Sequence, residues 1–319
     1  MERPATAARV RSIPGTTAAL QRMDRFTASR TLIAVIDTGS FSAAARQLGI
    51  GQPAVSKSIA LLEQMLETRL FSRSTRGLSP TDAAHAYYAH AVQALAQLDE
   101  AEDAARGEDA ALHGRLRVGV PVTFSSLHVI PRLAPFLARH PGLHIELLQD
   151  DRPVDLLAAG ADLALRLGPL PDSSMTARRL AQGPQHLLAS STYLDAHGAP
   201  LTLDDLAAHR CIVYARGRAP QRVELVGDAQ TRTLELRGSL SVSAAEGVRA
   251  AVLADLGIAL ASAWMFAPEL ADGTVRPVLT DWRLPPVDLW AVYPPGRQPG
   301  RKARAFAAWI EGQLAPVAD

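Results

Sequence analysis

The chain has 319 residues, and its 33 Lys and Arg against 32 Asp and Glu give a formal net charge of +1. Hydrophobic residues at 48% and charged residues at 20% exclude wholesale disorder, and the length predicts two domains or a small module beside a larger one. The single cysteine, Cys211, excludes an intrachain disulfide framework and a cysteine-cluster zinc site. No stretch approaches the roughly 20 apolar residues of a membrane span.

The first 22 residues are small, polar and interrupted by proline and glycine. They lack the contiguous apolar core of a secretory signal. We therefore expect a disordered leader, or a start codon assigned too far upstream of Met23, and a cytoplasmic protein.

Charge is unevenly distributed along the chain. Residues 1–80 carry 11 Lys and Arg against 5 Asp and Glu, residues 81–112 carry 1 against 7, and residues 113–319 carry 21 against 20. A basic head followed by an acidic stretch indicates nucleic-acid contact by the head, although part of the excess lies in the leader.

Residues 23–80 read as a three-helix unit with a wing. A first helix over 24–38 is expected to carry an apolar stripe of Phe26, Ile33 and Ile36, with Leu32 and Val35 alongside. Ser40 precedes a second helix, whose inward face holds Phe41, Ala44, Ala45 and Leu48. A turn at Gly49–Gly51 leads to a third helix that starts at Gln52-Pro53 and buries Val55, Ile59 and Leu62. The basic segment SRSTRGLSPT then predicts a short β-wing.

A helix, a short turn and a second helix with polar residues at its start form the arrangement that enters a DNA major groove. We assign base contacts to the exposed start of the third helix, at Gln52, Pro53, Ala54, Ser56 and Lys57. Phosphate contacts are assigned to Ser40, Ser42, Arg46, Arg73 and Arg76. The alternative is a small helical bundle with a solvated polar face.

The run from Gly39 to Thr81, GSFSAAARQLGIGQPAVSKSIALLEQMLETRLFSRSTRGLSPT, resembles the DNA-binding domain of LysR-type transcriptional regulators. Two positions depart from the family pattern, in which glycine is common: Glu67 after the third helix, and Ala84 after Thr81. The resemblance extends over nearly all of the chain from Met23 onward.

Residues 81–106 contain no glycine or proline and predict one long helix. Its apolar positions Ala84, Tyr88, Ala91, Leu95 and Leu98 repeat at heptad spacing. Either this face packs on its own domain, or, as the family resemblance implies, it pairs antiparallel with the same helix of a second subunit. Dimerisation then predicts a pseudo-palindromic operator on double-stranded DNA, and the family's usual dimer of dimers predicts a homotetramer.

Residues 107–114 are expected to form a hinge before an effector-binding domain, 115–319. There, strands at 116–120, 143–148 and 162–165 alternate with helices at 127–137 and 154–159, a βαβ rhythm that predicts an α/β fold with a parallel sheet. The pattern restarts with strands 186–189 and 211–214, helix 244–253, strands 257–260 and 288–293 and helix 301–314.

The family resemblance implies two periplasmic-binding-protein-like lobes. Lobe I is placed at about 115–187 plus 288–319 and lobe II at about 188–287, with a small-molecule effector between them. Open α/β sheets bind ligands beyond the carboxyl ends of their strands. The cleft residues expected on this rule are Thr123, Ser125, Ser126, Arg166, Gly168, Tyr214 and Ser243.

Arg166 suggests an effector chemistry, since a guanidinium at a strand end can hold a carboxylate through two hydrogen bonds. Helix starts near Ser125 and Ser243 would also favour an anion. The alternative is that Arg166 pairs with Asp150, Asp151 or Asp162.

The sequence contains no phosphate-binding, dinucleotide-binding, zinc-protease or serine-hydrolase motif, so we expect no enzyme activity, no cofactor and no metal. Cys211 opens an apolar strand and is expected to be a core residue rather than a redox switch. The alternative function is a solute receptor or a catalytic α/β protein that does not bind DNA, which leaves residues 39–81 unexplained.

Overall fold

A computed structural model describes residues 25–74, 77–106, 111–153, 155–170, 175–214, 221–227, 230–295 and 298–314. The predicted leader, Arg76 and the first part of the predicted hinge lie outside these residues. The chain divides into two compact units, residues 1–101 and 102–319, and each is described by itself. Among the described residues no helix is both long and apolar enough to cross a membrane.

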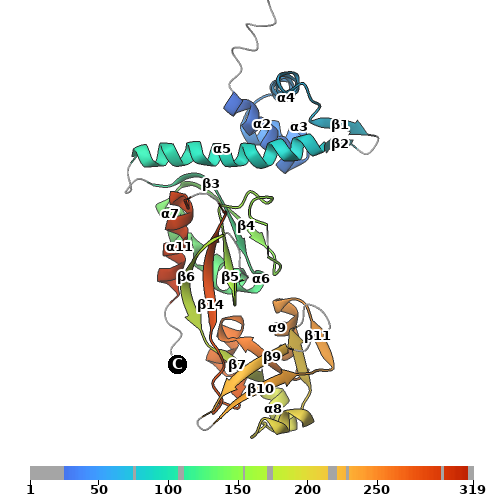
Figure 1. Ribbon diagram of the computed structural model, residues 1–319, viewed down its shortest axis with the longest axis vertical. Helices are drawn as coiled ribbons and strands as arrows, with labels where there is room; N and C mark the ends of the chain where they lie inside the picture. Colours follow the sequence, from blue (N-terminus) through green and yellow to red (C-terminus); the bar gives the residue numbers. More distant parts are fainter. Residues whose placement is uncertain are drawn as a thin grey trace, which may run out of the picture. The chain divides into compact units, whose positions relative to one another are not determined.

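The first unit is a three-helix bundle with a β-hairpin (Figure 1). Helices α2 (Arg25–Thr38), α3 (Phe41–Leu48) and α4 (Gln52–Leu66) are followed by strands β1 (Phe71–Ser74) and β2 (Gly77–Pro80) and by helix α5 (Asp82–Arg106). β1 and β2 pair antiparallel. The predicted winged helix-turn-helix is confirmed.

Local sequence explains where α3 and α4 start and stop. The Ser40 hydroxyl accepts a hydrogen bond from the amide of Ala43 at 3.4 Å, which caps α3. Gly49 ends α3 in the left-handed region, with φ of 65°. Glu67 adopts the same conformation after α4, with φ of 50°, so the chain forms the family's turn without its usual glycine.

The buried face of α2 differs from the predicted one. Phe26 is 48% exposed, and Ile33 and Ile36 are only half-buried. Leu32 and Val35, expected alongside that stripe, are fully buried, together with Ala28 and Thr31. The side chains of Ala28 and Thr31 are small, so the face that carries them can pack closely against the neighbouring helices. That close packing decides which face is buried, although the other face carries the larger apolar residues.

Glu63 and Thr81 tie the wing to the bundle. The Glu63 carboxylate accepts hydrogen bonds from the amides of Leu70 (2.7 Å) and Phe71 (3.2 Å), and the Thr81 hydroxyl donates to the carbonyl of Arg69 (2.9 Å). The Phe71 ring packs edge-on against Phe41, with centroids 5.6 Å apart. The wing therefore has a fixed attachment to α3 and α4.

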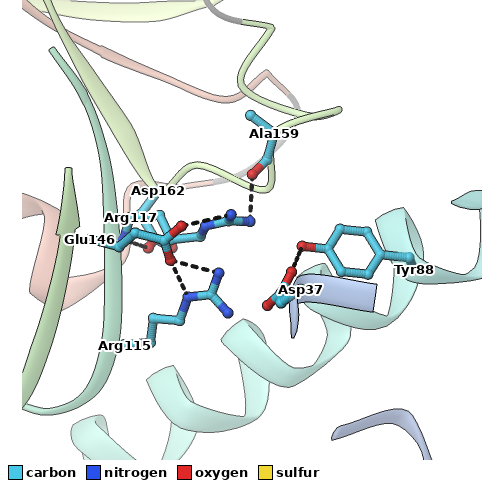
Figure 2. Close-up of polar contacts among 7 residues, drawn as sticks. All are labelled: Asp37, Tyr88, Arg115, Arg117, Glu146, Ala159 and Asp162. Carbon is cyan, nitrogen blue, oxygen red and sulfur yellow. Dashed lines mark hydrogen bonds and ion pairs between the residues drawn. The ribbon is translucent and has the colours of Figure 1, made fainter. Parts of the chain in front are cut away.

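The predicted long helix is present as α5, starting one residue later than expected. Ala84 is fully buried in the core of the bundle, and the Tyr88 hydroxyl donates to the Asp37 carboxylate at 2.7 Å (Figure 2). Ala84 is thus enclosed by its own unit, which corrects its assignment to a dimer contact.

The second unit contains two mixed sheets. The first has the order β4 (Gly142–Gln149), β3 (His113–Val120), β5 (Leu163–Leu167), β14 (Val287–Tyr293), β6 (Thr176–Gly183). The second has the order β11 (Leu240–Val242), β8 (Cys211–Tyr214), β12 (Ile258–Ser262), β7 (Gln185–Ser190), β13 (Val275–Val278). A hairpin of β9 (Gln221–Val226) and β10 (Thr231–Leu236) accompanies the second sheet (Figure 1).

The expectation of parallel sheets is only partly right. β3 runs parallel to both of its neighbours, but β14 is antiparallel to β5 and β6, and β7 is antiparallel to β12 and β13. The chain passes between the lobes twice. The strand that follows each passage, β7 in the second sheet and β14 in the first, runs antiparallel to both of its neighbours. The first passage lies at Pro184, between β6 and β7, so residues 185–187 belong to lobe II and not to lobe I as predicted.

The helical segment after β3 has a different inward face from the one that its apolar spacing predicts, which is Leu127, Ile130, Leu133 and Leu137. It consists of α6 (Val122–Phe124), a π-helical turn (Ser125–Val129), a 3-10 turn (Ile130–Arg132) and α7 (Leu133–Arg139). Ile130 and Leu137 are exposed, whereas Phe124, Val129 and Phe136 are buried. The wider π turn changes the angular position of every later side chain, which a constant 3.6-residue period cannot anticipate.

The remaining elements are helices α8 (Ser191–His197), α9 (Ala245–Leu253), α10 (Ala267–Asp272) and α11 (Arg301–Gln313), with 3-10 turns at Asp204–Ala208 and Ala263–Phe266. The helix predicted at 154–159 is replaced, over its described part, by hydrogen-bonded turns. Cys211 is buried in the lobe II core as expected, and burial raises the pKa of its thiol.

Candidate functional site

The start of α4 presents the side chains predicted to read DNA. Val55, Ile59 and Leu62 are buried, and the opposite face is exposed. That exposed face carries all of the predicted base contacts: Gln52, Pro53, Ala54, Ser56 and Lys57. A rigid helix with amide, hydroxyl and ammonium groups at its accessible end can reach base edges in a major groove.

The predicted phosphate contacts lie on α3 and the wing. Ser42 and Arg46 are exposed on α3, and Ser40 is half-buried at its cap. Arg73 lies on β1 opposite Leu78, and Arg76 lies outside the described residues.

The second unit contains a cavity of about 430 Å³ between its two lobes. Lobe I contributes the ends of β3, β4 and β5, and lobe II contributes the ends of β8 and β12 and the start of α9. Its wall is mainly apolar, with Leu165, Leu167, Tyr214, Leu260 and Met265. The cavity lies where the strand-end rule predicts it.

Three of the predicted cleft residues, Arg166, Gly168 and Tyr214, line this cavity. Gly168 has φ of 88° and its carbonyl accepts a hydrogen bond from the indole of Trp290 at 3.1 Å. That bond and the left-handed turn fix the chain directly after Arg166. Partial burial lowers the pKa of the Arg166 guanidinium, which nevertheless stays charged near neutral pH.

The other four predicted residues, Thr123, Ser125, Ser126 and Ser243, are not among the lining residues. The Thr123 hydroxyl donates to Glu246 in lobe II at 3.2 Å. Ser125 is fully buried, and its hydroxyl accepts a hydrogen bond from the side-chain amide of Gln149. The Ser126 hydroxyl donates to the carbonyl of Val122, one turn earlier. Small hydroxyl residues after a strand resemble ligand contacts in sequence, but here Ser125 and Ser126 bond within lobe I and Thr123 bonds to lobe II.

Two of the carboxylates considered as partners of Arg166 accept hydrogen bonds from backbone amides. Asp162 accepts from the Arg117 amide at 2.8 Å, and Asp150 accepts from the Arg152 amide at 2.7 Å. The Arg117 guanidinium also holds Glu146 at 2.9 Å and the carbonyl of Ala159 at 2.6 Å (Figure 2). This network fixes the turn between β4 and β5, and hence the start of the strand that carries Arg166.

Asp151 and Gln221 also line the cavity and are not among the predicted binding residues. Asp151 accepts hydrogen bonds from the amides of Val122 (3.1 Å) and Ala245 (2.9 Å), so it joins the lobes. Gln221, at the start of β9, lines the cavity with a buried side-chain oxygen that has no hydrogen-bond partner among the residues the structure describes. The sequence alone does not mark either residue as a binding residue. Asp151, for example, acts on amides that are 29 and 94 residues away along the chain.

The sequence matches a LysR substrate binding domain over residues 109–315 and a bacterial regulatory helix-turn-helix domain of the lysR family over residues 26–85. The chain belongs to the LysR family of transcriptional regulators. It is therefore a DNA-binding regulator with an effector-binding domain. Proteins of this family regulate transcription and are not enzymes, so the catalytic alternative is set aside.

Similarity to individual relatives extends over most of the chain. An HTH-type transcriptional regulator of Haemophilus influenzae is 34% identical, with 85% of this chain and 94% of the relative covered. The regulator YhjC of Escherichia coli is 32% identical over 93% of this chain and 100% of its own. The solved structure of CrgA, a LysR-type regulator from Neisseria meningitidis, has 27% identity, covers 90% of this chain and 98% of its own, and gives a TM-score of 0.58.

Proposed function

We propose that this regulator binds a pseudo-palindromic operator as a homo-oligomer, a dimer of dimers, through the exposed start of α4. The observation that carries the proposal is the accessibility of Gln52, Ser56 and Lys57 on a helix whose other face is buried. From Met23 to Pro80 the head carries 7 Lys and Arg against 4 Asp and Glu, a small positive excess. A single head should therefore bind weakly, and several linked heads would supply the affinity. A protein that regulates transcription in this way would act in the cytoplasm, where its DNA target lies.

The effector that fits the cleft best is a small carboxylate that also carries a hydrogen-bond donor. Arg166 supplies a cation at a strand end, and the apolar wall accommodates a hydrocarbon body. The buried oxygen of Gln221 needs a donor, and a hydroxyl or amino group of the ligand would provide one.

A thermal-shift screen of small carboxylates tests this effector class, because a ligand that binds the folded state raises its stability. Pairs such as 3-phenylpropionate and 3-phenyllactate differ only in a hydroxyl donor. We expect the hydroxy acid to give the larger shift, Gln221→Leu to remove the difference between the two, and Arg166→Lys to weaken both. An unchanged response to every carboxylate in Arg166→Lys would contradict the role of Arg166.

Effector binding would act by shifting the population between two arrangements of the lobes. This requires that the ligand bind one arrangement more tightly than the other. The cleft meets that condition in principle because its lining comes from both lobes.

A further inference from the structure

Helix α9 begins without a capping side chain of its own. Its N-cap position is Ala244, which has extended backbone angles suitable for a cap but no side-chain acceptor. Alanine is a poor N-cap residue, since it leaves the first amides of the helix without a partner. The chain itself therefore supplies no side-chain acceptor at the cap position of α9, although Glu246 adds an acidic residue to its first turn.

The missing acceptor comes from the other lobe. Asp151, in the loop after β4, accepts from the Ala245 amide with one carboxylate oxygen (2.9 Å) and from the Val122 amide with the other (3.1 Å). Asp151 and Val122 belong to lobe I and Ala245 to lobe II. A charged acceptor is also favoured by the positive end of the α9 helix dipole.

Neighbouring contacts place this carboxylate in a wider seam between the lobes. The Thr123 hydroxyl donates to Glu246, one residue beyond Ala245, and the His128 ring contacts the Trp264 carbonyl at 2.7 Å. Thr123 and His128 are both buried. The lobes are thus joined by polar contacts at the edge of the effector cavity, to which both Asp151 and Ala245 contribute lining.

We propose that Asp151 is an internal ligand of the effector domain, an N-cap for α9 that is supplied across the cleft. The first turn of α9 is then capped only while the two lobes lie close together. In the absence of effector, the same two hydrogen bonds hold the lobes together at this edge. Asp151 also occupies the position that an anion would take at the start of α9. If the effector is a carboxylate, as proposed above, its acid group cannot bind at the start of α9 and binds Arg166 instead.

Removal of the side chain and its replacement by a free anion test the proposal without an effector. In full-length Asp151→Gly, amide hydrogen exchange resolved to single residues should become about tenfold faster at both Val122 and Ala245. Sodium formate at about 100 mM should restore protection at both amides, since it can occupy the vacated position. Sodium chloride at the same ionic strength should not.

Matched variants make the result specific. Asp150→Gly removes the adjacent carboxylate, which bonds within its own loop, and should leave both amides protected. Asp151→Asn keeps one acceptor oxygen and should lose protection at one amide only. Ala244→Ser added to Asp151→Gly supplies a local cap, and should slow exchange in α9 while Val122 stays fast.

The proposal is overturned if Asp151→Gly leaves the Ala245 amide as protected as in the wild type, or if formate restores neither amide. If Asp151→Gly does not fold, the Asp151→Asn result decides: equal protection of both amides contradicts the cap. These outcomes do not depend on Arg166, so they are independent of whether the effector is a carboxylate.

Discussion

On our proposal, individual side chains at the start of α4 would determine which DNA this protein recognises, because they lie on an exposed face that does not pack against the rest of the unit. Gln52 can bond an adenine through two hydrogen bonds, and Lys57 can donate to guanine or to phosphate. Both residues are exposed, so their removal should affect DNA binding and not folding.

Gln52→Ala should weaken operator binding by about 10- to 100-fold, the usual cost of one lost base contact. Gln64→Ala is the matched control, since Gln64 is exposed on the same helix but lies near its other end. Fluorescence anisotropy on operator DNA measures both affinities, and thermal denaturation confirms that both variants fold. Equal affinities for the two variants would remove Gln52 from the interface.

His128 gives the effector domain a pH dependence. Burial lowers the pKa of His128 below its ordinary value of 6.5, against the opposing effect of its bond to Trp264. As the pH falls, His128 is therefore protonated near pH 6.5 in the unfolded chain, but only at a lower pH in the folded protein. The stability that comes from neutral His128 is present above that pH and is lost as the pH falls through the folded-state pKa.

We expect the unfolding midpoint in urea to fall between about pH 7 and about pH 5, and His128→Gln to make that fall smaller. Part of the fall should remain in the variant, because burial also lowers the pKa of His140 and His186. A variant with the same pH dependence as the wild type would show that His128 does not contribute.

At the scale of elements, α5 packs within its own unit and is also predicted to contact a second copy. Its first turns pack within their own unit, through Ala84 and the Tyr88–Asp37 hydrogen bond. The later heptad position Leu98 is only half-buried and remains the better candidate for contact with a second copy. Packing on its own unit therefore describes the first turns of α5, and pairing with a second subunit stays a prediction for its later part.

Leu98→Asp should weaken self-association by at least about tenfold, because it introduces a charge into an apolar contact. Gln97→Asp adds the same charge to the neighbouring exposed position and should leave association unchanged. Sedimentation velocity over a range of concentrations distinguishes these results. Dissociation in both variants would point to net charge rather than to the predicted seam.

Elements with a regular period were predictable from sequence, and those that depend on distant contacts were not. The α3–turn–α4 unit follows from its cap, its glycine turn and its apolar spacing, and β8 has the predicted bounds of Cys211–Tyr214. The helical segment after β3 was misread because its π turn breaks the period. Strands β6 and β13 lack an apolar alternation that marks them in sequence, and they form because a neighbouring strand offers hydrogen bonds.

The same distinction holds for the effector cleft. Arg166, Gly168 and Tyr214 were predictable because they follow strands whose ends meet at one edge. Asp151 and Gln221 were not, since the first acts on a helix 94 residues later and the second belongs to a hairpin without a sequence signal.

For the whole molecule, the net charge of +1 misleads when it is taken alone. A basic head and an acidic α5 segment cancel, and the effector domain is nearly neutral. DNA binding should therefore depend on the assembly of several modestly basic heads rather than on the bulk charge.

The most direct test is a gel-shift titration of the full-length protein, over a series of salt concentrations, on the DNA upstream of its own gene. We predict binding that weakens steadily with salt and is lost more steeply for the oligomer than for the Leu98→Asp variant, because more phosphate contacts act together. The absence of salt-sensitive binding at this DNA and at neighbouring promoters would contradict the account.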